Sequence, residues 1–143
     1  MAKTPIFKAP LNPTLVLFMS FLIGPFLGWL FAMGILSALS ISVYPLDMRA
    51  MFATSWGALF FGYVFCFLLG WSRLQKWEKN NDPLIWKSIK AGLILGTLFS
   101  LPMAFLTSIW VPSLGLSIIL LGALLGIGYG LGITGTYKLL KKI

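Results

Sequence analysis

The chain alternates between long apolar runs and short polar segments. Its 11 basic and three acidic residues gather in or beside the polar segments and leave the centres of the apolar runs uncharged. A helix needs about 20 predominantly apolar residues to cross a hydrocarbon core, and four runs reach that length. The pattern predicts membrane-spanning helices over residues 15–41, 51–72, 83–110 and 114–137, with a basic connector over 73–87.

Composition agrees with this pattern. The 143 residues are 59% hydrophobic and only 10% charged, whereas soluble domains carry about 25% charged residues. So little polar surface cannot coat a soluble globule, and no polar segment is long enough to fold alone. We therefore expect one membrane domain over residues 1–143, an all-α integral membrane four-helix bundle.

The basic residues predict how the chain is threaded. If four helices cross the membrane, ten of the 11 basic residues fall on one side: Lys3, Lys8, Arg73, Lys76, Lys79, Lys87, Lys90, Lys138, Lys141 and Lys142. Arg49, close to Asp47, falls on the other side. Loops rich in lysine and arginine stay in the cytoplasm. We expect both termini to be cytoplasmic and the protein to reside in a bacterial inner membrane.

Tryptophans mark both predicted membrane edges. Trp71, Trp77 and Trp86 lie at the basic edge and Trp110 at the opposite edge, and amphipathic rings favour the headgroup zone. The basic cluster of the connector is suited to attract anionic lipids, at about 1 kcal/mol for each residue near the surface. Its members are Arg73, Lys76, Lys79, Lys87 and Lys90. Membrane threading already accounts for this charge, so we predict no nucleic-acid partner.

Glycines recur at helical spacing in the last apolar run. Gly122, Gly126 and Gly130 are four residues apart, and so are Gly128 and Gly132. The first run has a shorter pair, Gly24 and Gly28. Residues four apart share one helix face, and a face without side chains lets another helix approach closely. That partner is either another helix of this chain or a helix of a second copy or another subunit.

Two of the predicted helices share a pattern. Gly57-Ala58-Leu59 matches Gly122-Ala123-Leu124, and Arg73-Leu74-Gln75-Lys76 matches Lys138-Leu139-Leu140-Lys141. This suggests two pseudo-repeated hairpins related by an axis along the membrane normal.

The residue content limits the chemistry. Histidine is absent, cysteine occurs once and acidic residues number three. General acid–base catalysis and metal binding depend on these residue types. We expect no enzyme activity, no cofactor and no metal. Asp82, followed by Pro83, is predicted only to cap the start of the third helix.

Three functions fit these features. The favoured one is a non-catalytic accessory or assembly subunit of a larger membrane complex, acting through helix packing. The second is a homo-oligomeric channel, small transporter or lipid-handling protein, in which hydroxyl groups line an uncharged pathway. The candidate hydroxyls are those of Ser20, Thr54, Ser55, Thr97, Ser100, Thr107, Thr134 and Thr136. The third is a membrane sensor, defence or toxin-immunity component.

Overall fold

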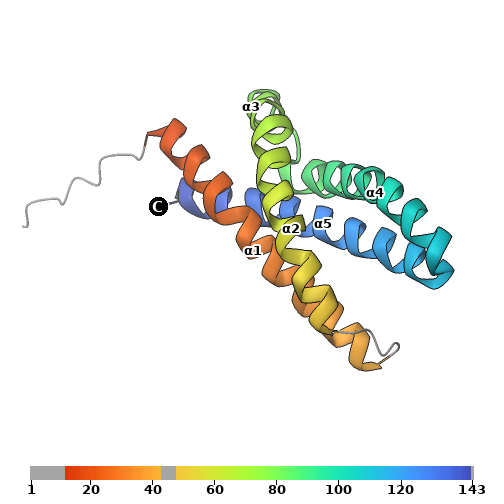
Figure 1. Cartoon of the computed structure of the whole chain (residues 1–143). Helices are drawn as coiled ribbons and strands as arrows, with labels where there is room; N and C mark the ends of the chain where they lie inside the picture. Colours follow the sequence, from red (N-terminus) through yellow and green to blue (C-terminus); the bar gives the residue numbers. More distant parts are fainter. Residues whose placement is uncertain (1–11, 43–47, 143) are drawn as a thin grey trace, which may run out of the picture.

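The computed structural model describes residues 12–42 and 48–142. Three charged residues used to predict the threading of the chain lie outside the described residues: Lys3, Lys8 and Asp47. Every regular element in the described chain is helical (Figure 1). The elements are α1 (Pro13–Ser42), α2 (Met48–Phe65), the π-helical turn η1 (Cys66–Gly70), α3 (Trp71–Lys79), α4 (Leu84–Trp110) and α5 (Pro112–Lys142). α2, η1 and α3 follow one another without a break, so the fold has four helices in all.

Three segments are long and apolar enough to cross a membrane. They are Pro13–Ala38 in α1, Leu84–Trp110 as α4, and Gly115–Lys142 in α5. Large apolar side chains point outward from these helices, with Phe31 53% and Leu116 74% exposed. A soluble protein rarely exposes so much contiguous apolar surface. The all-α prediction is confirmed, and the three helices indicate an integral membrane protein.

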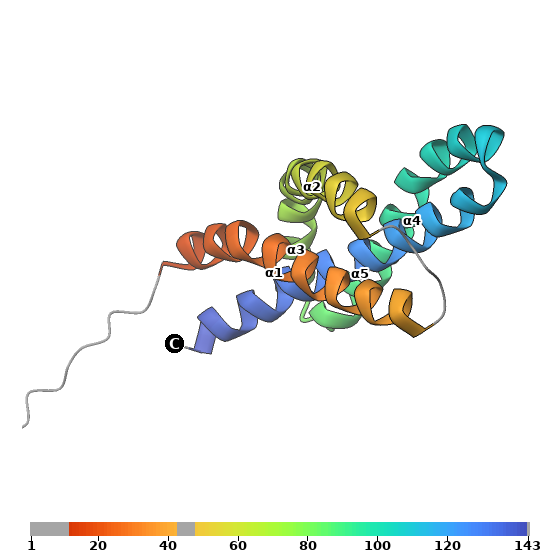
Figure 2. The same ribbon diagram turned by 60° about the horizontal axis from the view of Figure 1, so that its bottom comes forward.

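α5 is the central helix of the fold. α4 runs alongside it, and α1 crosses its other flank (Figures 1 and 2). α2 contacts α1 far less than α4 contacts α5, so the two predicted hairpins are packed differently. The packing lends no support to the predicted duplication.

α2, η1 and α3 rest on α1 mainly through aromatic rings. Phe21 of α1 lies 5.6 Å from Phe67 and 5.4 Å from Trp71, measured between ring centroids. Further along, Trp29 lies 5.3 Å from Trp56. Bulky rings hold helices farther apart than glycines do. The α2–α3 arm therefore reaches α5 through side chains, such as Leu59 clustered with Leu125, and not through close backbone contact.

The second helix is longer than the sequence pattern predicted. It continues beyond residue 72 to Lys79, because Leu74 is buried against Val16 and Leu17 and gives the polar segment an apolar anchor. Asn80 caps this end, and the chain turns away from the helix at Asn81, which has a φ of 55°. The N–H of Asn81 donates to the Glu78 carbonyl and that of Asp82 to the Trp77 carbonyl, the hydrogen-bond pattern of a Schellman motif.

The predicted cap at Asp82 is wrong. α4 begins at Leu84, Pro83 is its flanking residue, and no side chain caps this end. The Asp82 carboxylate instead accepts a hydrogen bond from the Lys87 ammonium. Because the extended residue that flanks the helix is Pro83, Asp82 lies one position too early to serve as the cap, and its carboxylate pairs with Lys87 instead.

Candidate functional site

One glycine stripe of α5 faces α4. A Cβ added to Gly126 would lie 1.9 Å from the Gly92 carbonyl oxygen, and one added to Gly122 would lie 2.6 Å from the Gly96 carbonyl oxygen. At Gly130 the nearest atom would be the Ser88 carbonyl oxygen, at 2.4 Å. The two backbones are therefore in direct contact, and any side chain on this stripe would separate them.

The second stripe of α5 faces α1. A Cβ on Gly132 would lie 2.0 Å from the Gly24 carbonyl oxygen, and one on Gly128 would lie 2.4 Å from the Gly28 carbonyl oxygen. All seven glycines singled out by the sequence thus lie at contacts between helices of the same chain. A docking surface for another subunit has to be sought elsewhere.

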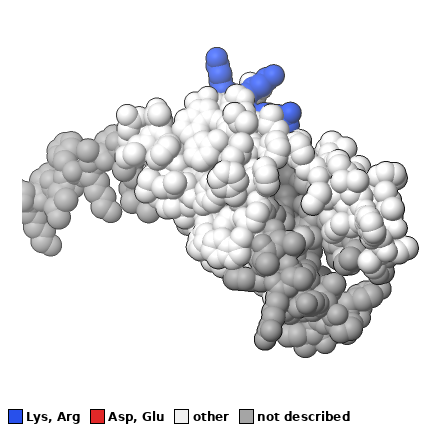
Figure 3. Space-filling model, viewed as in Figure 1, with Lys and Arg blue, Asp and Glu red and all other residues white. Residues whose placement is uncertain are grey.

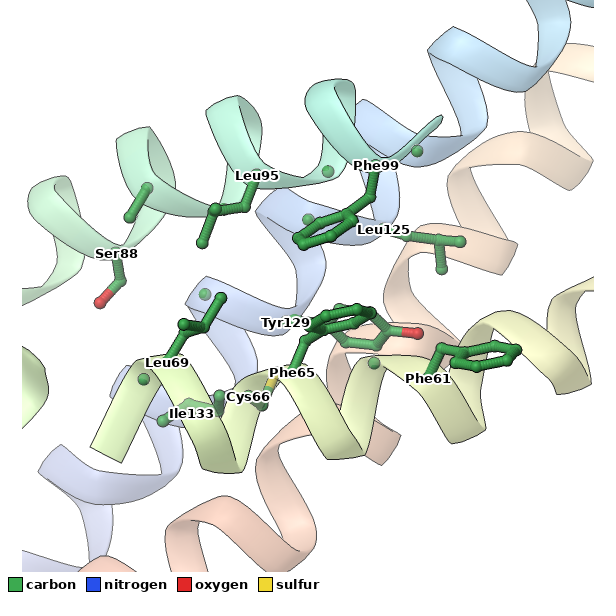
Figure 4. Close-up of a pocket in the computed structure, with 18 of the residues that line it drawn as sticks. Phe61, Phe65, Cys66, Leu69, Ser88, Leu95, Phe99, Leu125, Tyr129 and Ile133 are labelled. Carbon is green, nitrogen blue, oxygen red and sulfur yellow. The ribbon is translucent and has the colours of Figure 1, made fainter. Parts of the chain in front are cut away.

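A large apolar cleft separates the α2–α3 arm from α4. Its volume is about 700 Å³, and α5 forms its floor (Figure 4). Apolar side chains and glycines make up most of its walls. They include Phe61, Phe65, Cys66 and Leu69 on the arm, Ala91, Leu95, Phe99 and Met103 on α4, and Leu125, Tyr129 and Ile133 on α5.

The cleft follows from how its walls are held. Glycines pack α4 directly against α5, whereas aromatic rings pack the α2–α3 arm against α1, so the two walls are held by different contacts. Phe65 and Phe99 bridge them, with ring centroids 4.1 Å apart. Along α4 the lining runs from Ser88 to Met103, which at 1.5 Å per residue is about 22 Å.

One end of the cleft is polar. Arg73 and Trp77 line it from the arm and Ser88 from α4. Arg73 and Trp77 are four residues apart and therefore share a helix face. No ion pair between described residues uses Arg73. Since no acidic residue lines the cleft, its polar end carries positive charge.

Ser88 differs from the other buried hydroxyl residues of the described chain. Ser20, Ser100, Thr134 and Thr136 each donate to a carbonyl of their own helix. Ser88 is only 7% exposed, and none of the hydrogen bonds between described residues uses its hydroxyl. Figure 4 shows that hydroxyl directed into the cleft. It is therefore available to a ligand.

The carboxylates near the cleft's polar end already have partners. Glu78 accepts hydrogen bonds from the Tyr137 hydroxyl and the Lys141 ammonium, which ties α3 to α5. Burial raises the pKa of the Glu78 carboxyl, but the two hydrogen bonds and the charge of Lys141 outweigh burial and hold the pKa below its usual value. Asp82 pairs with Lys87. Neither carboxylate neutralises Arg73.

The basic cluster surrounds this end of the molecule. Blue side chains gather at the α3 end of Figure 3, and no red one is visible among the described residues of that face. Lys76 and Lys79 of α3 are exposed, and Lys90 lies over the Trp86 ring at 5.4 Å. Lys87 alone of the predicted cluster has a carboxylate partner among the described residues.

The four predicted anchor tryptophans occupy different environments. Trp110 is 86% and Trp86 59% exposed at opposite ends of α4. Trp71 is packed against Phe21 and Phe67, and Trp77 lines the cleft. Trp71 and Trp77 therefore also shape the interior.

Sequence reasoning missed the cleft. Arg73 had been assigned to membrane threading and to a basic cluster that attracts anionic lipids, Trp77 had been assigned to anchoring, and Ser88 had not been singled out. The sequence pattern that could have identified this site is a cation and an aromatic ring one helical turn apart, followed by a hydroxyl residue early in the next helix. In the described residues, no group of three or more histidine, cysteine, aspartate or glutamate side chains could hold a metal ion.

Comparison of the chain with models of protein families, with curated proteins and with solved structures finds no match.

Proposed function

We propose that this chain is a non-catalytic, lipid-handling membrane protein that holds one acyl chain of a membrane lipid in the cleft between the α2–α3 arm and α4. The apolar cleft of about 700 Å³ is the observation that carries the proposal. Its volume lies within the roughly 300–1,000 Å³ of pockets that bind small molecules. One leaflet is about 15 Å deep. The stretch of α4 from Ser88 to the Phe65–Phe99 ring pair is about 16 Å long, which matches the length of one acyl chain.

The hydroxyl groups support lipid handling over ion or solute conduction. Thr97 and Thr107, like the buried Ser20, Ser100 and Thr134, donate to carbonyls of their own helices. Hydroxyls used in this way offer few free polar groups to a permeating ion. An apolar chain, by contrast, needs only the burial that these walls supply.

A role as accessory subunit of a larger complex stays a prediction. The glycine stripes that suggested it are occupied by helices of this chain, so a partner would need another surface. A polypeptide of constant mass bound in place of lipid would favour that role over the present proposal.

The lipid proposal is tested by native mass spectrometry of the protein after gentle extraction and detergent exchange. We expect one retained lipid per chain, visible as a discrete mass increment that collisional activation removes. A chain that remains folded and carries no lipid at any stage of detergent exchange would contradict the proposal.

The proposal includes four membrane crossings, with both chain ends and the α3–α4 connection in the cytoplasm. In a Cys66→Ala background, Asn12→Cys and Asn80→Cys should react with an impermeant thiol reagent from the same side. Val111→Cys should react from the other side. If the α2–α3 arm did not cross, labelling of positions 12 and 80 would occur from opposite sides, because α1 alone would separate them.

A further inference from the structure

We infer that the cleft selects lipids with a net negative headgroup, and that Arg73 and Ser88 bind that headgroup's anionic oxygens at the polar end. The inference rests on the proposed lipid-binding function and adds the chemical class of the ligand. It identifies the polar end as a binding site distinct from the apolar walls.

The charge of the polar end favours an anion. Arg73 lines the cleft, forms no ion pair with a described residue, and no carboxylate shares the lining with it. A guanidinium presents several N–H donors in a fixed fork that suits phosphate and carboxylate oxygens. Arg73 is itself exposed at this end of the cleft, where a basic residue near the membrane surface attracts an anionic headgroup by about 1 kcal/mol.

Ser88 supplies an independent observation on the opposite wall. Its side chain is more than nine-tenths buried, its hydroxyl points into the cleft (Figure 4), and it has no hydrogen-bond partner among the described residues. The hydroxyl is open to the cleft and is therefore free to donate to a ligand there. An anionic oxygen held between α3 and α4 would accept that hydrogen bond while pairing with Arg73.

Trp77 completes the site. It lies one turn after Arg73 on the same face of α3 and also lines the cleft. An indole ring is apolar over most of its surface and has one N–H donor. It is suited to the boundary between a charged headgroup and its acyl chain. The apolar walls beyond Trp77 then cover the chain itself.

The test compares the retention of phosphatidylglycerol and phosphatidylethanolamine with identical acyl chains, offered as an equimolar mixture and measured by native mass spectrometry. We expect the wild-type protein to prefer the anionic lipid about fivefold or more, the effect of a single basic residue near a membrane surface. Arg73→Gln should bring the ratio close to one and leave total lipid occupancy unchanged. Ser88→Ala should lower the ratio by a smaller factor.

Two matched variants control for unspecific effects. Lys138→Gln removes an exposed positive charge that does not line the cleft. Ser20→Ala removes a buried hydroxyl of α1 that donates to the Val16 carbonyl and does not line the cleft. Both should retain the wild-type ratio. If Arg73→Gln cannot be recovered folded, comparison of Ser88→Ala with Ser20→Ala tests the inference.

The outcomes separate the two proposals. Equal retention of both lipids by the wild type, or equal losses in Arg73→Gln and Lys138→Gln, would overturn the inference and leave lipid binding intact. Absence of any bound lipid would overturn the proposed function as well.

Discussion

Gly126→Ala is expected to lower the free energy of unfolding by about 3 kcal/mol, at the upper end of what overpacking a core costs. The added methyl carbon would lie 1.9 Å from the Gly92 carbonyl oxygen and 3.1 Å from the Gly96 Cα. These are backbone atoms, which cannot rotate away as a side chain can. α4 and α5 would have to separate along their length, and the contacts at Gly122 and Gly130 would be lost with them.

Gly135→Ala on the same helix is the matched control. Apart from its chain neighbours and the nearby backbone of α5 itself, no atom lies within 4 Å of the position that its Cβ would occupy. Because alanine is the better helix former by about 1 kcal/mol in water, this variant should be neutral or slightly more stable. Thermal unfolding of both variants in detergent measures the difference. Equal melting temperatures would show that α4 and α5 do not pack through this stripe.

The glycine pattern shows what the sequence could establish. Spacing alone indicated that Gly122, Gly126 and Gly130 form one face and that Gly128 and Gly132 form another, and the structure places those faces against α4 and α1. Spacing could not identify the partner, since a glycine face admits any helix that presents a small residue. Gly92 and Gly96, which complete the contact on α4, fit the same four-residue spacing but had not been singled out.

The end of the second helix shows a different limit. Polar residues after position 72 suggested a connector, yet the helix continues to Lys79 because buried Leu74 and the hydrogen-bonded Glu78 fasten α3 to its neighbours. Both contacts join residues far apart in the chain, and local pattern does not reveal them. The turn at Asn81 that follows this helix is easier to predict from the sequence, because asparagine tolerates the left-handed conformation that ends many helices.

The cleft could not be predicted from the sequence, because it too depends on contacts between residues far apart in the chain. Its width depends on two unlike contacts, glycine against glycine on one wall and ring against ring on the other. Hydropathy does not distinguish these contacts, because both walls are formed by apolar helices. Neither the gap between them nor the direction of Ser88 follows from a residue's type. Arg73 was therefore assigned to the threading of the chain and to a basic cluster that attracts anionic lipids, and not to a cleft.

Filling the cleft is expected to remove its ligand and leave the fold intact. Ala91 lines the cleft from α4, and Ala91→Trp would place an indole in the space assigned to the acyl chain. Lipid occupancy measured by native mass spectrometry should fall at least tenfold. The melting temperature should change little, because the indole enters space that no protein atom occupies. Leu69→Trp, from the α2–α3 wall, should act in the same way.

Ile94→Trp provides the comparison, since Ile94 is 58% exposed on α4 and lies outside the cleft lining. This variant should retain lipid as the wild type does. Equal retention by Ala91→Trp and Ile94→Trp would mean that lipid binds to the outer surface of α4, where any apolar helix contacts the bilayer. Loss confined to the two cleft variants would assign the lipid to the cleft, because all three substitutions add the same apolar ring and differ only in where it points.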